Sequence, residues 1–176
     1  MTSTPAGSIT TAEHVHWVLD LAESAGARLW IDGGWAVDAL LGKQTRVHGD
    51  LDFVIEERHL APCLAVITAA GFTRVGESGA TPWNFLLQHP CRAVLDLHVV
   101  TFADDGRAFL GPRERDSAYP AGSLTGSGVI ADREVDCVAA PWLVEFHDAY
   151  VGDHHDRADV RALCARFDLE IPEQYR

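Results

Sequence analysis

The 176-residue sequence has little basic charge. Its 14 lysine and arginine residues stand against 26 aspartate and glutamate residues, which gives a formal net charge of −12 at pH 7. A protein that binds a nucleic-acid polymer needs a basic surface to neutralise phosphates. The composition therefore argues against DNA or RNA as a partner. An acidic surface can simply keep the protein soluble, or it can attract a cationic small molecule, and the first interpretation is at least as good as the second.

The sequence also lacks a cysteine framework and any long apolar run. None of its cysteines forms a Cys-x-x-Cys pair, so we expect reduced thiols at Cys63, Cys91, Cys137 and Cys164. The polar start at 1–8 has no basic segment followed by an apolar run, and no apolar stretch is long enough to span a bilayer. These absences predict a soluble, cytoplasmic protein without a membrane partner.

Hydrophobic periodicity predicts a disordered start at 1–9 and a single domain over 10–176, without repeats or low-complexity segments. The order is helix-strand-helix-strand-helix, then several strands, then two closing helices within about 141–168 that pack on the domain. This order is typical of an α+β fold with a small mixed sheet flanked by helices. We interpret 102–125, which has little periodicity, as a loop with at most one short strand.

The expected elements follow from apolar spacing and from cap and turn residues. The first helix is expected to start at a Thr10–Glu13 capping box and to end before Gly26. The other helices are expected at 35–41, 60–70, 141–150 and 156–167. Strands are expected at 27–31, 51–55, 72–75, 83–88, 93–100, 129–131 and 134–137.

Residues that can support chemistry gather between 29 and 53. A strand leads into the double-glycine turn Gly33-Gly34, then a short helix, then a strand that opens with Asp50 and Asp52. Side chains two apart on a strand share a face, so these carboxylates project together. Their repulsion is best tolerated with a cation between them, and oxygen ligands favour Mg²⁺. The first N–H groups of the helix offer a site for phosphate oxygens.

Asp96 extends this pattern, because it lies on a strand that could neighbour the strand of Asp50 and Asp52. Three carboxylates at one sheet edge can hold two divalent ions, as in two-metal phosphoryl-transfer sites. The third carboxylate is also placed to take a proton from an acceptor hydroxyl. The pattern predicts nucleotidyl transfer, in which a hydroxyl attacks an α-phosphate and pyrophosphate leaves.

The sequence resembles the small antibiotic nucleotidyltransferases, the aminoglycoside and lincosamide enzymes of the polymerase-β-like nucleotidyltransferase superfamily. Gly49 and the step Asp148-Ala149 depart from that pattern and leave the acceptor open. The resemblance runs from about Trp30 to Val160 and is carried by Trp30–Gly42, Thr45–Asp52, Leu95–His98, Phe146–Tyr150 and Asp156–Val160.

The resemblance implies roles for particular residues. Asp50 and Asp52 would be metal ligands, Asp96 the third metal ligand and general base, and Gly33 and Gly34 contacts of the triphosphate. It also implies the polymerase-β-like nucleotidyltransferase fold, two Mg²⁺ ions, and ATP or another NTP as the donor.

Four further polar residues are less specific. Arg46 and His48 are expected to contact the triphosphate, although Arg46 could equally pair with a neighbouring carboxylate. His98 shares a strand face with Asp96, so it either lines the acceptor pocket or is simply a polar strand residue. We interpret Asp38 as a structural hydrogen-bond partner.

We therefore expect a Mg²⁺-dependent nucleotidyltransferase that transfers AMP from ATP to a hydroxyl of a small-molecule acceptor, first of all an aminoglycoside or lincosamide antibiotic. One alternative is a minimal, antitoxin-like nucleotidyltransferase that modifies a partner protein. Another is a non-catalytic nucleotide-binding or dimerisation module. A homodimer is compatible with the sequence and not demonstrated by it.

Overall fold

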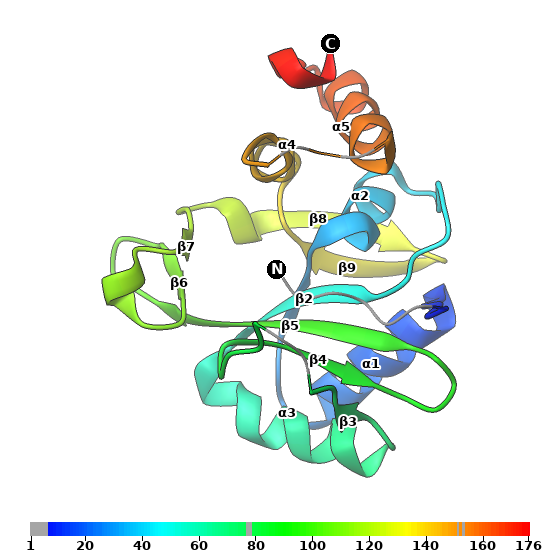
Figure 1. Cartoon of the computed structure of the whole chain (residues 1–176), viewed down its shortest axis with the longest axis vertical. Coiled ribbons are helices and arrows are strands. Elements are labelled where there is room, and N and C mark those ends of the chain that lie inside the picture. The colour runs from blue at the N-terminus through cyan, green and yellow to red at the C-terminus, as the bar shows by residue number, and fades with distance from the viewer. Residues whose placement is uncertain (1–6, 77–78, 151, 153) are drawn as a thin grey trace.

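The computed structural model describes residues 7–76, 79–150, 152 and 154–176 (Figure 1). Its centre is a mixed sheet with the strand order β3-β4-β5-β2-β1-β9-β8, and β6 and β7 extend from β5 as an arm. This architecture confirms the predicted α+β class. The strands are β1 (Leu29–Ile31), β2 (Leu51–Glu56), β3 (Thr73–Arg74), β4 (Asn84–Gln88), β5 (Val94–Phe102), β6 (Ala108–Leu110), β7 (Ala118–Tyr119), β8 (Gly126–Ile130) and β9 (Arg133–Cys137).

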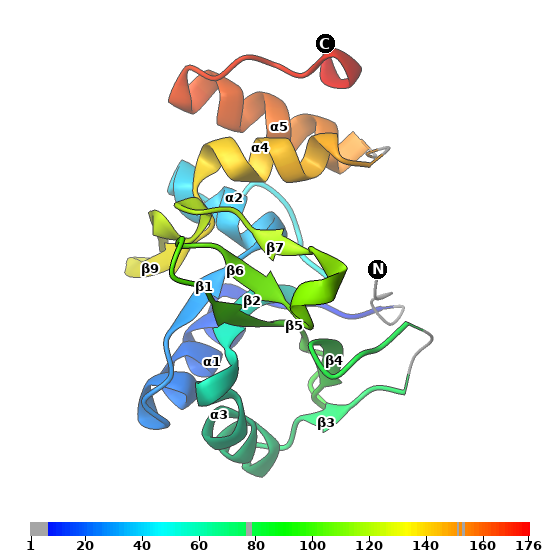
Figure 2. The same ribbon diagram turned by 90° about the vertical axis from the view of Figure 1, so that its left-hand side faces the viewer.

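Helices cover both faces of the sheet (Figures 1 and 2). On one face lie α1 (Ala12–Ser24) and α3 (Glu57–Ala69). On the other face α2 (Gly33–Leu41) lies between the sheet and the closing helices α4 (Ala140–Asp148) and α5 (His154–Phe167). Three short 3-10 helices complete the chain: η1 (Arg113–Arg115), η2 (Ser123–Thr125) and η3 (Glu173–Tyr175).

The core lies on both sides of β2 and β5. Leu51, Phe53 and Ile55 are fully buried, as their alternation predicts. Val54, which points to the other face, is fully buried as well, because α2 and its neighbours cover that face. A strand that is buried on both faces holds its register firmly, since a shift by one residue would exchange the two faces.

The start of α1 differs from the prediction. Its N-cap is Thr11, which forms a capping box with His14, rather than Thr10 with Glu13. Thr10 cannot serve as the cap because it forms a β-bridge with His48, with 2.9 Å between its N and the His48 carbonyl oxygen. Of the expected disordered start at 1–9, residues 1–6 lie outside the described residues. The division into 1–9 and 10–176 remains a prediction.

The interpretation of 102–125 as a loop with at most one short strand is wrong. β5 continues to Phe102, and β6 pairs with β5 while β7 pairs with β6. β6 has three residues and β7 has two, which is too short for an alternating pattern to appear in the sequence. This β6–β7 arm places Tyr119 beside the central strands.

Other boundaries move by a few residues for local reasons. α2 begins at Gly33 rather than Trp35, because Asp32 caps it, and Gly42 ends it at a φ of 68° as expected. α3 begins at Glu57, so Pro62 lies beyond its first turn. Among the described residues, none of the helices has the length and apolar character needed to cross a bilayer.

The strands expected at 129–131 and 134–137, which leave 132–133 for a hairpin turn, form the β8–β9 hairpin, but its turn lies one residue earlier. Ala131 has a φ of 43° and Asp132 a φ of 69°. Two consecutive left-handed residues form the turn type that suits a two-residue hairpin and that favours Asn-Gly.

We predict that Ala131→Gly stabilises the protein. An alanine in the left-handed conformation destabilises the folded state by roughly 1–2 kcal/mol, and glycine removes this strain. Glycine also gives the unfolded chain more conformational freedom, so the net gain in the free energy of unfolding is about 0.5–1 kcal/mol. Chemical denaturation measures the change. The control is Ala65→Gly on the exposed face of α3, which should lower the free energy of unfolding by about 1 kcal/mol. Losses of equal size in both variants would contradict the left-handed turn.

Candidate active site

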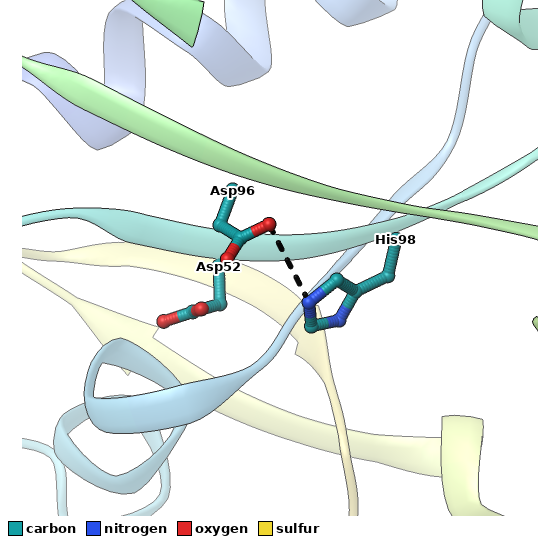
Figure 3. A group of neighbouring side chains, drawn as sticks. All are labelled: Asp52, Asp96 and His98. Carbon is teal, nitrogen blue, oxygen red and sulfur yellow. Dashed lines mark ion pairs between the residues drawn. The ribbon is translucent and has the colours of Figure 1, made fainter. Parts of the chain in front are cut away.

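Two parallel strands bring the predicted carboxylates together. β2 and β5 pair so that Asp52 lies opposite Asp96 and Val54 opposite His98. Figure 3 shows Asp52, Asp96 and His98 on neighbouring strands, with the His98 ring directed toward the Asp96 carboxylate. Each of the three offers one ligand atom, and these atoms lie within 4.8 Å of one another. The sequence placed Asp96 correctly beside the strand of Asp52.

Asp50 takes a different place from the one expected. It precedes β2 instead of opening it, and it does not belong to the group of atoms within 4.8 Å. It still lines the same cavity, and its charge is felt at Asp52. The potential ligand group in the described residues thus contains His98 beside two aspartates, while Asp50 stands at its border.

The negative charge of Asp52 is not balanced by the positive charge around it. Removal from water raises its pKa well above the usual range, and the charges of Asp50, Asp96 and Asp32 raise it further, while His98 opposes them. A bound cation would relieve this repulsion. Carboxylate oxygens dominate the donor set, so the ion that fits best is a hard one such as Mg²⁺.

The start of α2 lies against this cluster. The Asp32 side chain caps the helix, with Oδ1 accepting a 2.8 Å hydrogen bond from the Gly33 N–H, and the Asp32 N–H donates to the Asp52 carbonyl oxygen over 2.9 Å. Gly33 has a φ of +56°, and a Cβ there would collide with the Asp52 carboxylate. A Cβ on Gly34 would collide with the side chains of Arg46 and His48. Both glycines are therefore required by the close approach of the helix to the site.

Arg46 and His48 are held by carboxylates of other elements. Arg46 Nη2 lies 3.1 Å from Oδ2 of Asp159, an α5 residue whose side chain is 4% exposed. His48 Nε2 lies 2.5 Å from Asp38 Oδ2, and Asp38 Oδ1 accepts from the Thr45 N–H over 2.9 Å. These contacts confirm the structural role expected for Asp38. Arg46 pairs with a carboxylate and also lines the cavity, so its contact with phosphate stays a prediction.

Tyr119 and Asp32 form a network with His98 that the sequence did not reveal. The Tyr119 hydroxyl donates to Asp32 Oδ2 over 2.7 Å and lies 2.6 Å from His98 Nδ1. Burial disfavours the charged form of His98, but Asp32, through its hydrogen bond and charge, together with Asp96 and Asp52, raises the pKa of His98 to about 9. Burial acts to raise the pKa of Asp32, but the hydrogen bond and charge of His98, with the hydrogen bonds from Tyr119 and the Gly33 N–H, lower it below its usual value.

Asn84 is a second residue that was missed. Its Nδ2 donates to Asp96 Oδ1 over 2.7 Å and to the Leu97 carbonyl oxygen over 3.3 Å. The polar residue beside the apolar run Phe85–Leu87 could have been noticed, and the hairpin register then sets Asn84 opposite His98. No comparable signal marked Tyr119.

The closing helices provide the far wall of the cavity. From α4 and the segment that follows come Leu143, Phe146, His147 and Tyr150, and from the first turn of α5 comes Asp156. The Tyr150 hydroxyl donates to Asp156 Oδ1 over 3.1 Å. The volume of the cavity is about 580 Å³. A cavity of this size accepts drug-sized molecules.

Comparison with known proteins agrees with this geometry. Residues 14–163 match the sequence model of the aminoglycoside-2''-adenylyltransferase family. The chain belongs to this family. It is a nucleotidyltransferase, as the sequence predicted, with a nucleotidyltransferase fold.

Two relatives are named for the antibiotics that they concern. A lincosamide resistance protein of Staphylococcus haemolyticus is 28% identical over 153 residues, which cover 87% of this chain and 94% of that protein. A 2''-aminoglycoside nucleotidyltransferase of Escherichia coli is 32% identical over 125 residues, which cover 70% of this chain and 64% of that protein.

Two solved structures are similar throughout the chain. The lincomycin-bound crystal structure of lincosamide antibiotic adenylyltransferase LnuA has a TM-score of 0.78 at 27% identity, covering 90% of this chain and 99% of that chain. The crystal structure of ANT(2'')-Ia with adenylyl-2''-tobramycin has a TM-score of 0.71 at 25% identity, covering 89% and 88%.

We predict that Gly33→Ala removes nucleotidyl transfer, because the added methyl group displaces the Asp52 carboxylate. Gly42→Ala at the other end of α2 is the matched control, since it has the same left-handed backbone (φ +68°) and its Cβ meets nothing within 4 Å. Both variants should lose about 1–2 kcal/mol of stability from the backbone. Activity should fall more than about 100-fold, or about 2.7 kcal/mol in barrier, for Gly33→Ala alone. Equal activities in the two variants would contradict the role of the close approach.

Proposed function

We propose that the protein is a Mg²⁺-dependent adenylyltransferase that transfers AMP from ATP to a hydroxyl of an aminoglycoside or lincosamide antibiotic. The observation that carries the proposal is the pairing of Asp52 with Asp96 at the start of α2, inside a cavity of about 580 Å³. LnuA is a lincosamide antibiotic adenylyltransferase and ANT(2'')-Ia was solved with adenylyl-2''-tobramycin, which supports the donor group and the acceptor classes.

Asp50, Asp52 and Asp96 would hold the metal. Bound Mg²⁺ supplies neutralisation of phosphate charge and alignment of the reacting oxygens. The raised pKa of Asp52 supports this assignment, because burial and the nearby carboxylates, which both raise it, disfavour a negative charge that a bound cation would stabilise.

The donor would lie along α2. The Gly34 N–H at the helix start would donate to a triphosphate oxygen, and the helix dipole favours the anion there. The Gly33 N–H already donates to Asp32, so Gly33 would contact the triphosphate through its Cα. Arg46, oriented by Asp159, would present its guanidinium to the same phosphates, with His48 beside it. A closely packed glycine pair allows the backbone itself to reach the phosphate.

Asp96 would act as the general base. The acceptor hydroxyl oxygen attacks the α-phosphorus and forms a new P–O bond, while the bond from this phosphorus to the bridging oxygen of the β-phosphate breaks. The hydroxyl proton passes to the Asp96 carboxylate, and pyrophosphate leaves with the electron pair of the broken bond. Asn84 orients Asp96 through the 2.7 Å hydrogen bond to Oδ1.

The acceptor would fill the space between α4 and the strands β2 and β5. The carboxylates that line this space favour an acceptor that carries amines, and aminoglycosides and lincosamides both do. Phe146 and Tyr150 offer apolar and hydroxyl surface to a sugar or an alkyl group. The carboxylates are Asp32, Asp50, Asp52, Asp96 and Asp156.

A mass-spectrometric assay tests the proposal directly. The purified chain is incubated with Mg²⁺, each of the four NTPs in turn, and a panel of aminoglycosides and lincosamides. The expected product is one antibiotic that has gained the mass of AMP, with an equal amount of pyrophosphate released. Failure with every antibiotic under conditions in which ATP binds would overturn the acceptor class.

We predict that Asp52→Asn abolishes transfer and raises the melting temperature in chelator, because it removes one of the repelling charges. The stabilisation by added Mg²⁺ should disappear in the same variant, which thermal denaturation measures with and without the metal. Asp104→Asn, an exposed carboxylate, is the control and should behave as the original protein. Activity above about a tenth of the original, a loss of only about 1.4 kcal/mol in barrier, would rule out Asp52 as an essential metal ligand.

We also predict that Asp96→Ala lowers kcat by a larger factor than it lowers the affinity for ATP. A base acts in the transition state, whereas a ligand that only holds the donor complex affects binding to the same degree. Steady-state kinetics and ATP titration give the two factors. Equal losses would leave Asp96 as a metal ligand without a role as base.

A further inference from the structure

We propose that Tyr119 is a positioning residue of the transfer reaction, whose hydroxyl holds His98 in place at the acceptor side of the site. This inference rests on the proposed function. It concerns the β6–β7 arm, which supplies Leu110, Ser117, Ala118 and Tyr119 to the cavity wall.

The chemistry of the three side chains determines which atom donates and which accepts in each hydrogen bond. The one hydroxyl proton of Tyr119 goes to Asp32 Oδ2, because that oxygen can only accept, and the distance is 2.7 Å. The hydroxyl oxygen then accepts from His98 Nδ1 over 2.6 Å, so His98 carries a proton on Nδ1. The ring therefore turns Nε2 toward the cavity and toward Asp96 Oδ1, 3.7 Å away. Tyr119 and Asp32 are each only 7% exposed, so water does not readily replace these bonds.

The same hydroxyl links the two walls of the cavity. Asp32 caps α2 through Gly33 and donates its own N–H to the Asp52 carbonyl oxygen, so it belongs to the donor wall. His98 belongs to the strand of Asp96. Tyr119, which lies on the β6–β7 arm, forms hydrogen bonds with both Asp32 and His98. A rigid link at this point sets the distance between the proton-accepting strand and the helix proposed to hold the phosphates.

The position of Tyr119 predicts which kinetic constant depends on it. Arg46 and His48 lie against Gly34, on the side proposed for the triphosphate, whereas the arm and His98 lie on the wall proposed for the acceptor. Loss of the hydroxyl should therefore disturb the placement of the acceptor relative to Asp96 and leave the binding of ATP largely as it is. Misplacement of reacting groups lowers kcat more than it lowers affinity.

The test compares Tyr119→Phe with Tyr175→Phe. Tyr175 is 2% exposed and donates its hydroxyl to the His147 carbonyl oxygen over 2.7 Å, so its variant loses a buried hydroxyl of the same kind at a position outside the cavity lining. We expect kcat to fall about 10- to 100-fold in Tyr119→Phe, with the KM for ATP changed by less than about twofold. Tyr175→Phe should lower the melting temperature and keep kcat.

A second readout does not need turnover. In the original protein and in Tyr175→Phe, the Nδ1 proton of His98 should give a downfield, slowly exchanging NMR signal. Tyr119→Phe should move this signal upfield and speed its exchange, because Nδ1 is then left with Asp32 Oδ2, 3.5 Å away, as its acceptor. Combined with His98→Ala, Tyr119→Phe should add less than about a threefold further loss of kcat, because both substitutions remove the same contact.

The outcomes separate the inference from the proposed function. If the original protein modifies no antibiotic, the proposed function fails, and the NMR comparison still decides whether Tyr119 holds His98. If the original protein is active and Tyr119→Phe matches Tyr175→Phe in kcat, or if the His98 signal is unchanged in Tyr119→Phe, the positioning role is wrong.

Discussion

The pairing of β2 with β5 is the constraint on which the site depends. Apolar side chains on the two strands bury each other and the helices, and this burial fixes a register in which Asp52 faces Asp96. The hydrophobic core thus holds two like charges side by side, because a shift of the strand register by one residue would expose the apolar side chains. The charged cluster is unfavourable on its own, and the packing of the fold supplies the free energy that maintains it.

The groups around the cluster compensate it in part. Asn84 donates to Asp96, His98 brings a positive charge, and α2 directs its N-terminal end toward Asp52. These contributions leave the pKa of Asp52 well above the usual range. Burial of Asp52 and the charges of Asp50, Asp96 and Asp32 outweigh these contributions, and a bound cation would offset them. Binding of a hard cation would therefore stabilise the fold as well as enable the chemistry.

Most of the donor half could be predicted from the sequence, since its signals are local. The double glycine and Asp52 lie within twenty positions of each other, and strand alternation together with a glycine turn describes their arrangement. Contacts between distant segments could not be predicted. Arg46 meets Asp159 across 113 positions, and Thr10 meets His48 through a single bridge that displaces the expected helix cap. Tyr119 belongs to a two-residue strand, which is too short to carry any period.

This difference between local and distant contacts explains how the two halves of the cavity can serve different purposes. The wall proposed for the donor comes mostly from residues 32–52, which pack against the core, and is completed by Asp96 of β5 and Asp159 of α5, so a substitution there disturbs the carboxylate cluster. The wall proposed for the acceptor is assembled from β5, the β6–β7 arm and the closing helices, and in the described part of the chain the strands of the arm pair with the sheet through β5. Side chains such as Leu110 and Ser117 can therefore change the shape of the acceptor wall without altering the pairing of Asp52 with Asp96. Tyr119 is the exception within the arm, because its hydroxyl donates to Asp32 and so connects the arm to the residue that caps α2 beside Asp52.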